Sequence, residues 1–373
     1  MVNLNALGII FPNMHDSELK ELTDHRTMAS VPFAGRYRLI DFVLSGMTAA
    51  GVQNVGLIVK KNYQSLMDHL GNGREWDLSR KRGGLTIFPP NSAGEGTDYH
   101  GRIEALHTIL PYIEKAKEDY VILADCNVVC NMDYAALVQK HQELGADITI
   151  AYTKEKMTPA IEKNNISLQL APSGRVRELL TNDSTTGKRN LSMGIMVVGR
   201  EMLVSIVKNA FSKGQVRFEQ EIIAKKLETM QVYGYEFSGY RSRIVDMGSY
   251  FEANMQMLYV ENLNRLFPEG RPIYTKVRDE APVRYAIDCK VKNVTMADGC
   301  IIEGEVENCI LFRGCRVGKG AVVKNCILMQ NTVIGPGARM NYVITDKDVT
   351  VSEGQYLGGT KNFQVFVKKG STV

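Results

Sequence analysis

The stretch LKELTDHRTMASVPFAGRYRLIDFVL, residues 19–44, decides the fold of this 373-residue chain. A short apolar strand at 6–10 and a loop precede it, and strand–helix units follow it as far as about residue 250. Its second half carries apolar residues at helical spacing up to Gly51, which predicts a helix over 38–50. Strands alternating with helices predict an α/β fold with a doubly wound, mostly parallel sheet that binds ligands at the carboxyl ends of its strands.

The pattern of apolar runs and turn residues predicts the remaining elements of this first domain. Further strands are expected at 54–59, 85–89, 120–124, 146–153, 166–171, 194–198, 233–237 and 243–245. Further helices are expected at 62–70, 102–115, 215–226 and 249–264. A polar, glycine-rich loop is expected over 91–101.

The last part of the chain has a different periodicity. VENCIL at 306–311, VKNCIL at 323–328 and MNYVI at 340–344 recur every 17 residues, with hexads such as VGKGAV between them. One aliphatic residue in every six is typical of a parallel β-helix, in which stacked coils bury a continuous core. The predicted division is an α/β domain at 1–265, a linker at 266–284 and a β-helix at 285–373.

Composition excludes several classes of function. The formal net charge of +4 is small and spread along the chain, so neither nucleic acid nor a membrane surface is expected as a partner. No run of 18 apolar residues and no secretory leader pattern occurs, and a cytoplasmic location is expected. Seven cysteines without zinc-like pairing are expected to be buried, reduced side chains.

The segment VPFAGRYRLIDF, residues 31–42, resembles the VPFGGKYRLIDF signature of the glucose-1-phosphate adenylyltransferases, or ADP-glucose pyrophosphorylases. The resemblance extends over essentially the whole chain. It implies a Rossmann-like, GT-A-like nucleotidyltransferase domain followed by a left-handed β-helix of hexapeptide repeats. It also implies a place in glycogen biosynthesis, where the family joins ATP and glucose 1-phosphate into ADP-glucose and pyrophosphate.

The residues on either side of that signature depart from the family pattern. In the family, a GGxGxRL loop follows the first strand and wraps the nucleotide phosphates with closely approaching backbone N–H groups. Here the corresponding segment, FPNMHDSEL at 11–19, has no glycine. Glu18 stands where the family has arginine, and Met28 stands where it has lysine. Because charge clamps on a transferred phosphoryl group are worth roughly 10³–10⁵ in rate, these changes predict little activity.

The metal site that the resemblance implies is also altered. Two aspartates hold a divalent metal in the family, and Mg²⁺ prefers such oxygen ligands. Alignment through the segment MDY at 132–134 places Asn127, a weaker neutral ligand, at the first position. Asp125, two residues earlier, is an alternative, and Asp246 matches the second aspartate. Mg²⁺ is therefore expected at Asp246 with Asp125 only if the chain is active, and otherwise no cofactor is expected.

The family's nucleotide motif YxGTADA corresponds to YHGRIEA at 99–105. Tyr99 and Gly101 are retained, whereas Arg102 occupies a small threonine position and Glu104 replaces aspartate. Arg102 is expected to fill the nucleotide pocket, to bind an anionic effector, or to form a charge pair at the helix N-terminus. Of the residues that face the sugar phosphate, the family strand survives at Ser192 and Gly194, and Glu178 is the one candidate relic of its EKP motif.

A retained scaffold with altered chemistry resembles the GlgD-type regulatory or non-catalytic subunit of this family. The resemblance implies a hetero-oligomer with a catalytic subunit, expected to be a tetramer. Because arginine side chains bind phosphate oxygens bidentately, a phosphorylated metabolite is the expected effector. Arg36, Arg38 and Arg102 are the candidate anion contacts, unless they only pair with Asp41 and Glu104. The alternatives are a weak but active sugar-1-phosphate nucleotidyltransferase and, disfavoured because residues 285–373 contain no histidine, a β-helix acyltransferase.

Overall fold

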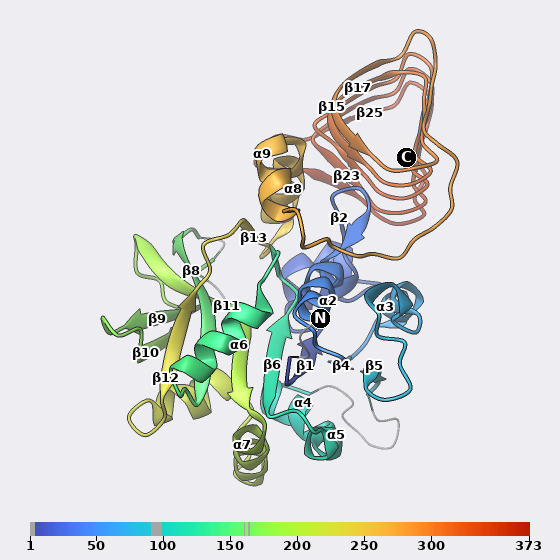
Figure 1. Cartoon of the computed structure of the whole chain (residues 1–373). Coiled ribbons are helices and arrows are strands. Elements are labelled where there is room, and N and C mark those ends of the chain that lie inside the picture. Colours follow the sequence, from blue (N-terminus) through green and yellow to red (C-terminus); the bar gives the residue numbers. More distant parts are fainter. Residues whose placement is uncertain (1–3, 91–98, 160, 163–164) are drawn as a thin grey trace.

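The computed structural model describes residues 4–90, 99–159, 161–162 and 165–373. An α/β domain occupies the first two-thirds of the chain, and a triangular column of stacked coils stands on it at the C-terminal end (Figure 1). An extended segment leads from the helices at the end of the first domain into the first coil (Figure 1).

A nine-stranded mixed sheet forms the α/β domain. At its centre, β1 (Ala6–Phe11) pairs in parallel with β4 (Asn54–Ile58) and β6 (Tyr120–Asp125). Beyond β4, β5 (Gly84–Phe88) extends the parallel half. Every residue of β1 is buried, as expected for a strand covered on both faces. The α/β fold predicted from the alternation of strands and helices is confirmed.

The other half of the sheet is built around the long strand β11 (Lys188–Gly199). This strand runs antiparallel to β6, to β8 (Ile148–Lys156) and to β9 (Ile166–Leu170). β10 (Val176–Thr181) pairs with β9, and β12 (Val232–Glu236) pairs in parallel with β8. The sheet therefore changes from parallel to antiparallel at β6, next to the candidate site.

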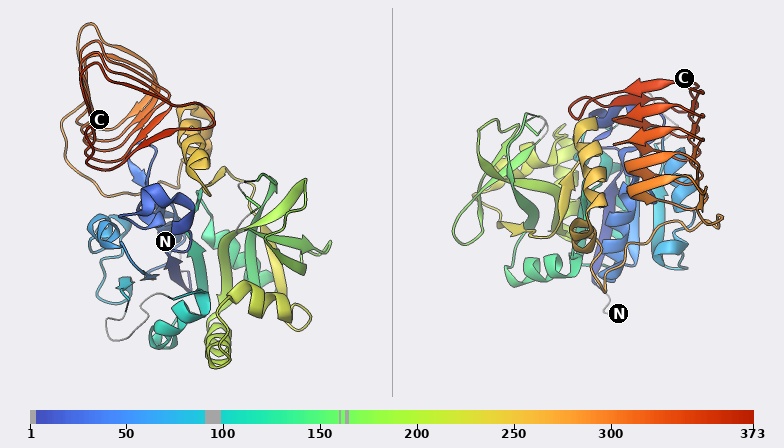
Figure 2. Two further views of the ribbon diagram at one scale, coloured as in Figure 1. Left: turned by 180° about the vertical axis from the view of Figure 1, so that it is seen from behind. Right: turned by 90° about the horizontal axis from the view of Figure 1, so that it is seen from above.

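Helices cover both faces of the sheet, and buried residues form a separate core on each (Figure 2). The signature segment enters α2 (Leu39–Ala49), where the backbone N–H of Arg38 donates to Asp41 Oδ2 at 2.9 Å. No helix within the described residues is long and apolar enough to cross a membrane. The other helices of this domain are α1 (Lys20–Thr23), α3 (Gln64–Leu70), α4 (Arg102–Thr108), α5 (Leu110–Lys115), α6 (Tyr134–Glu143), α7 (Arg200–Ser212), α8 (Met247–Met255) and α9 (Val260–Leu266).

Three segments expected as single helices are divided. The first splits into α4 and α5 because Pro111, the second residue of α5, has no N–H with which to continue the preceding helix. The second, around 215–226, is a short π-helical turn at Phe218–Ile223 followed by a 3₁₀ turn at Ala224–Lys226. The third splits into α8 and α9 at a 3₁₀ turn, Gln256–Leu258. The sequence analysis also did not identify α6 and α7.

The C-terminal coils form the predicted parallel β-helix. β17 (Glu305–Leu311) pairs in parallel with β15 (Lys290–Met296) on one side, and with β19 (Val322–Lys324) and β20 (Ile327–Leu328) on the other. The register advances by 17 residues per coil, as the repeat predicts, and Figure 2 shows the coils stacked edge on. The ladder of asparagines Asn293, Asn308, Asn325 and Asn341 links the side-chain amides of successive coils.

The signature segment begins with a hairpin that touches the β-helix. β2 (Pro32–Phe33) and β3 (Tyr37–Arg38) pair across a turn in which Gly35 adopts a φ of 76°. A Cβ atom at Gly35 would lie 3.3 Å from the backbone oxygen of Leu311 in β17, so the position favours glycine for both conformation and space. The segment that carries the family signature therefore also forms part of the contact between the two domains.

One hydrophobic core joins the two domains. The cluster that contains α2 also contains residues of the β-helix, namely Ile310, Phe312, Ile327, Met329 and Ile344. Within this apolar contact, Arg26 Nη2 donates to both oxygens of Asp346 at 2.7 and 2.9 Å, and each side chain is less than 5% exposed. A buried ion pair of this kind positions its partners strongly, because either charge alone would be costly.

We expect Arg26→Met to lower the free energy of unfolding by about 3–5 kcal/mol, since it leaves Asp346 buried without its cation. Urea denaturation followed by circular dichroism measures the change. The double variant Arg26→Met/Asp346→Leu should recover part of the loss. Arg80→Ala, which removes an exposed ion pair with Asp77, serves as the control and should cost at most about 1 kcal/mol. Equal losses for Arg26→Met and Arg80→Ala would contradict a structural role for the buried pair.

Candidate functional site

A polar cleft opens where the sheet changes direction. It lies at the carboxyl ends of β1 and β6, beside the start of α4 and the middle of β11. Asp125, the last residue of β6, lines this cleft together with Asn127, Ser192 and Gly194. The expectation that ligand-facing residues gather at this edge of the sheet therefore agrees with the placement of these four residues.

The loop after β1 is held by its own side chains. It continues from Phe11 into a 3₁₀ turn, Asp16–Leu19, rather than into a ring of free backbone N–H groups. Asp16 Oδ1 accepts a hydrogen bond from the backbone N–H of Met28 at 2.7 Å, and the Met28 side chain is buried in the core. Met28 is thus a packing residue that connects this loop to the signature segment.

The centre of the cleft is a network of five ionisable side chains. His15 lies between two carboxylates, with Nδ1 2.8 Å from Glu18 Oε1 and Nε2 3.0 Å from Asp125 Oδ2. Arg102 Nη2 donates to the same Asp125 oxygen at 2.6 Å, and Arg102 Nε lies 2.6 Å from Glu219 Oε1. We call this set, His15, Glu18, Arg102, Asp125 and Glu219, the cleft network.

Burial strengthens these pairs. The guanidinium of Arg102 is about 5% exposed and also lies over the ring of Phe11, with its carbon 4.7 Å from the ring centroid. Burial alone would raise the pKa of Asp125, but the charge of Arg102 and the hydrogen bond from His15 hold it below its ordinary value. Burial alone would lower the pKa of His15, but hydrogen bonds to Asp125 and Glu18 raise it to about 10. Both cations of the network are therefore charged at neutral pH.

Backbone geometry brings the strands close around Asp125. In β11 the pairing with β8 is interrupted between Ser192 and Met196, and Gly194 adopts a φ of 68° there. A Cβ atom at Gly194 would lie 2.5 Å from Asp125 Oδ2, so a side chain at this position would displace the carboxylate. Asn127 is buried next to the site, and its backbone oxygen accepts a hydrogen bond from Ile244 N at 2.8 Å.

The two carboxylates expected to hold Mg²⁺ are engaged elsewhere. Asp125 already faces two cationic side chains, as described above. Asp246 is the N-cap of α8, where its Oδ1 accepts from Ser249 N at 2.7 Å, and it is not among the residues that line the cleft. Within the described residues no group of three or more His, Cys, Asp or Glu side chains is arranged to hold a metal. This donor set does not fit a two-carboxylate magnesium site.

The residues of the YHGRIEA segment have separate roles. Tyr99 is buried and donates through its hydroxyl to Ile58 O at 3.1 Å. Gly101 precedes α4 as its N-cap and lies against Val216, where a Cβ atom would come within 2.3 Å of the backbone oxygen. Glu104 Oε2 accepts from His100 N at 2.5 Å and so closes the first turn of α4. Of the segment's four candidate residues, Arg102 alone reaches into the cleft network.

Glu178, the candidate relic of the EKP motif, is exposed on β10 and is not among the residues that line the cleft near β9 and β10. Asn165, Ile166 and Asn182 line the cleft there. The sequence analysis did not identify Asn182, which follows β10 and carries no motif of its own.

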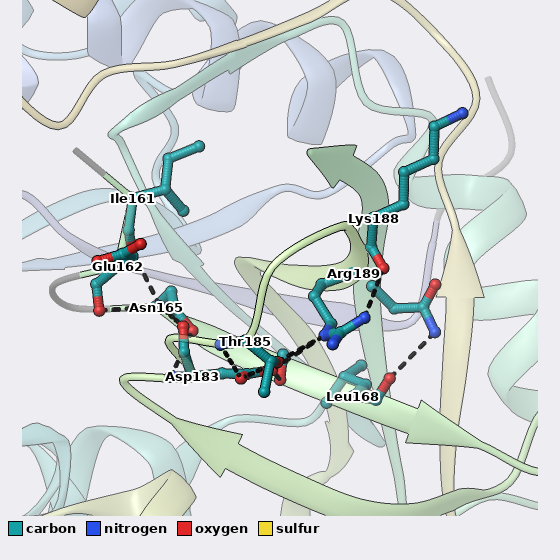
Figure 3. A network of polar contacts seen from close by, with 10 residues as sticks. Ile161, Glu162, Asn165, Leu168, Asp183, Thr185, Lys188 and Arg189 are labelled. Carbon is teal, nitrogen blue, oxygen red and sulfur yellow. Dashed lines mark hydrogen bonds and ion pairs between the residues drawn. The ribbon is translucent and has the colours of Figure 1, made fainter. Parts of the chain in front are cut away.

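A polar network holds this rim in place (Figure 3). Asn165 Nδ2 donates to the backbone oxygens of Ile161, Glu162 and Asp183 at 3.0, 3.1 and 3.0 Å. The Asp183 carboxylate accepts from Ser167 Oγ at 2.8 Å and from the hydroxyl of Thr185. These hydrogen bonds keep the pKa of Asp183 below its ordinary value, the largest cause being the Thr185 hydroxyl. The carboxylate of Asp183 therefore stabilises the loop at this rim through hydrogen bonds within the chain.

A second site lies between the two domains and is strongly basic. We call it the interdomain pocket; it is lined by Pro32, Gly35, Arg36, Tyr37, Arg38, His69, Lys276, Arg278, Phe312, Arg313, Gln330 and Lys347. Six of the twelve lining residues are lysine or arginine, and none of the twelve is aspartate or glutamate. Four polypeptide segments contribute, namely the signature hairpin, α3 through His69, the linker and the β-helix. Such a surplus of cations over a concave surface suits an anionic ligand.

The surplus charge affects the arginines themselves. Burial, together with the charges of Arg26 and Arg278, outweighs the effect of Asp41 and lowers the pKa of Arg38 to about 10. Burial and the charges of Arg278 and Arg36 lower the pKa of Arg313. Arg38 Nη1 donates to Ser65 O at 2.5 Å, so a neutral acceptor holds it in place.

The structure separates the candidate anion contacts into two sites. Arg36 and Arg38 line the interdomain pocket, whereas Arg102 belongs to the cleft network. Within the described part of the chain, Arg102 does not pair with Glu104, because its guanidinium faces Asp125 and Glu219 instead. Lys276, Arg278, Arg313 and Lys347 were missed, since only folding brings the linker and the β-helix to the hairpin.

Comparison with known proteins agrees with both domains. Residues 16–260 match the nucleotidyl transferase family, and residues 283–365 match the GlmU-like C-terminal hexapeptide family. The glycogen biosynthesis protein GlgD of Bacillus subtilis strain 168 is 35% identical over 370 residues, which cover 99% of this chain and 97% of that protein. The chain belongs to the glucose-1-phosphate adenylyltransferase family. The relatives that it resembles include proteins named GlgD and proteins named glucose-1-phosphate adenylyltransferase.

A second GlgD, from Geobacillus stearothermophilus, is 35% identical over 86% of this chain and 84% of that protein. A glucose-1-phosphate adenylyltransferase from the same organism is 32% identical over 85% of this chain and 83% of that protein. The adenylyltransferase family signature corresponds to the hairpin and α2, and the hairpin lines the interdomain pocket. Glu18 and Arg102, two of the residues that depart from the family pattern, lie in the cleft network.

The raised pKa of His15 predicts a pH dependence of stability. A base whose pKa rises on folding stabilises the protein fully below its unfolded value, here 6.5, and this contribution is lost as the pH rises through about 10. We therefore expect the free energy of unfolding to fall between these pH values, by a few kcal/mol, because one pKa unit is worth about 1.4 kcal/mol.

Urea titrations of the wild type and of His15→Gln across this pH range measure the effect. His15→Gln should be less stable at low pH and should show a shallower decline. His25→Gln, which changes an exposed histidine, is the control and should follow the wild-type curve. If the free energy of unfolding of His15→Gln falls with pH as steeply as that of the wild type, His15 is not the cation between Glu18 and Asp125.

Proposed function

We propose that this chain is a regulatory subunit, with little or no catalytic activity of its own, of a cytoplasmic glucose-1-phosphate adenylyltransferase assembly in glycogen biosynthesis. The observation that carries the proposal is the engagement of Asp125 by Arg102 and His15. These side chains place two positive charges where an enzyme of this family would need a carboxylate open to a metal. Glu18, which replaces the family's arginine, is tied to the same network.

Magnesium would supply charge neutralisation between the nucleotide and sugar phosphates in an active member of the family. Here Asp246 caps a helix and Asp125 is paired, so we expect no metal-dependent step in this chain. The alternative, a weak but active sugar-1-phosphate nucleotidyltransferase, draws support from the retention of Asp125 at the end of β6. It requires the cleft network to open when nucleotide arrives.

The proposed partner is a catalytic subunit of the same family, and the proposed assembly is a hetero-tetramer. The β-helix supports this, because the outer edges of its terminal strands are not paired within the described chain and invite coverage. The last coil also carries two exposed aromatic side chains, Tyr356 and Phe363, which are 69% and 74% exposed. Aromatic side chains of this kind are enriched at protein–protein contacts.

We expect the isolated chain to release pyrophosphate from ATP and glucose 1-phosphate at least about 10³-fold more slowly than an ordinary enzyme turning over at about 10 s⁻¹. A coupled pyrophosphate assay with Mg²⁺ measures this for the chain alone, for a catalytic subunit alone and for the mixture. The mixture should elute as one larger species and should differ from the catalytic subunit alone in its response to effectors. A turnover near 10 s⁻¹ for the isolated chain would overturn the proposal and favour the enzyme.

We further propose that a phosphorylated metabolite acts through the interdomain pocket rather than through the cleft. Arginine forks bind phosphate oxygens bidentately, and the pocket offers Arg36, Arg38 and Arg313 together with no competing carboxylate. Arg102 is excluded from this role because its guanidinium already faces Asp125 and Glu219. A ligand that binds one conformation better than another shifts the assembly towards it.

Arg36→Ala should raise the activation midpoint of sugar phosphates on the mixed assembly by about tenfold, since a hydrogen bond to a charged group is worth about 1.5–3 kcal/mol. Activity titrations of the mixture measure the midpoint. Arg177→Ala, at an exposed position on β10, is the matched control and should leave it unchanged. Should Arg36→Ala also leave the midpoint unchanged, the arginine is structural and the effector binds elsewhere.

A further inference from the structure

Of the two lysines that line the interdomain pocket, Lys347 is the one whose amine has no acceptor among the described residues. It follows β23 (Val343–Thr345) in the β-helix and lines the pocket while remaining partly exposed to solvent. The other pocket lysine, Lys276, donates its Nζ to Asp68 O. Among the described residues, no hydrogen bond or ion pair to Lys347 Nζ occurs; its backbone N–H alone donates, to Asp346 Oδ1 at 2.7 Å.

The neighbouring carboxylate does not compensate the Lys347 amine. Both oxygens of Asp346 already accept from Arg26 Nη2, at 2.7 and 2.9 Å. The other charged groups that act on Lys347 are the cations Arg38 from the hairpin and Lys369 from the C-terminal segment. The linker adds Lys276 and Arg278 to the same pocket, an earlier coil of the β-helix adds Arg313, and His69 lines it from α3.

These surroundings favour the neutral amine. Burial has the largest effect, and the charges of Arg38 and Arg26 add to it, so that the pKa of Lys347 falls to about 7. A large share of the molecules then carries an unprotonated Nζ at physiological pH, whereas an ordinary lysine with a pKa near 10.4 is almost fully protonated. A desolvated, neutral lysine amine is a nucleophile.

We propose that Lys347 is a modification site, at which the amine adds reversibly to carbon dioxide and forms a carbamate. The Nζ lone pair forms the new N–C bond, the electrons of one C=O bond move to oxygen, and the nitrogen releases one proton to solvent. Lysine and CO₂ thus give a carbamate anion and a proton, with no oxidant, reductant or further reactant. The reaction goes beyond the regulatory function proposed above and is open to the isolated chain.

The pocket suits the product as well as the nucleophile. The carbamate replaces a neutral or cationic amine by one negative charge with two acceptor oxygens, in a pocket with six lysine and arginine side chains and no carboxylate. Arg36 and Arg38 supply planar forks that match a carboxylate-like group. The modification would occupy the same cations that an anionic ligand needs, so CO₂ and an anion such as pyrophosphate are expected to compete.

The test uses the full chain alone with ¹³C-labelled bicarbonate. Carbon-13 NMR should show a carbamate resonance separate from those of CO₂ and bicarbonate, and Lys347→Met should lose it. Lys276→Met is the matched control and should retain it, since it removes the other lysine of the pocket. The wild-type signal should grow as the pH is raised from about 6 to about 8, because the reaction consumes the neutral amine.

Trapping with an alkyl oxonium salt converts the carbamate to a stable ester and identifies the residue by mass spectrometry. The peptide that contains Lys347 should carry the added mass in the wild type. An unmodified Lys347 peptide after trapping, or identical spectra for the wild type and Lys347→Met, would overturn the proposal. Trapping on the wild type needs no variant to fold and no partner or effector, so its failure is distinct from failure of the regulatory function.

Discussion

A carboxylate buried in the cleft must be neutralised, and much of the cleft is arranged around this requirement at Asp125. An isolated buried charge is too costly to retain, so a buried carboxylate at this position requires a cation beside it. Arg102 and His15 provide it from two separate segments, and Glu18 and Glu219 balance them in turn. The loss of the glycine-rich loop and the presence of the cleft network are therefore two aspects of one change, since His15 belongs to the segment that replaces that loop.

The interdomain pocket has the opposite balance. Among the described residues none of its lysines and arginines forms an ion pair with a carboxylate, and burial together with repulsion between the cations lowers the pKa values of Arg38 and Lys347. A fold that holds such a surplus gains stability from any anion that binds there, because binding to the folded state alone shifts the equilibrium towards it. The charges of the cleft network thus balance one another, whereas the positive charge of the interdomain pocket favours the binding of an anion.

Sequence patterns identified the β-helix and the parallel half of the sheet because these depend on local periodicity. They also identified Asp125, Arg102 and Gly194 as cleft residues, because all three lie in segments that resemble motifs of the family. They did not identify Glu219, because its approach to Arg102 follows from a π-helical turn without a pattern of its own. Lys347 was missed for a different reason: its neighbours lie about 300 residues away and meet it only when the β-helix packs on the hairpin.

One short segment connects the two sites. His15 reaches the cleft network, Asp16 holds the backbone of Met28, and Arg26 binds Asp346 beside Lys347. The same segment then enters the hairpin that presents Arg36. A change at the interdomain pocket therefore acts on a chain segment that is fixed at both ends by buried ion pairs. Because Asp125 in the cleft is already paired with side chains of the same chain, we propose that such a change acts across the contact with the proposed catalytic partner rather than on this cleft.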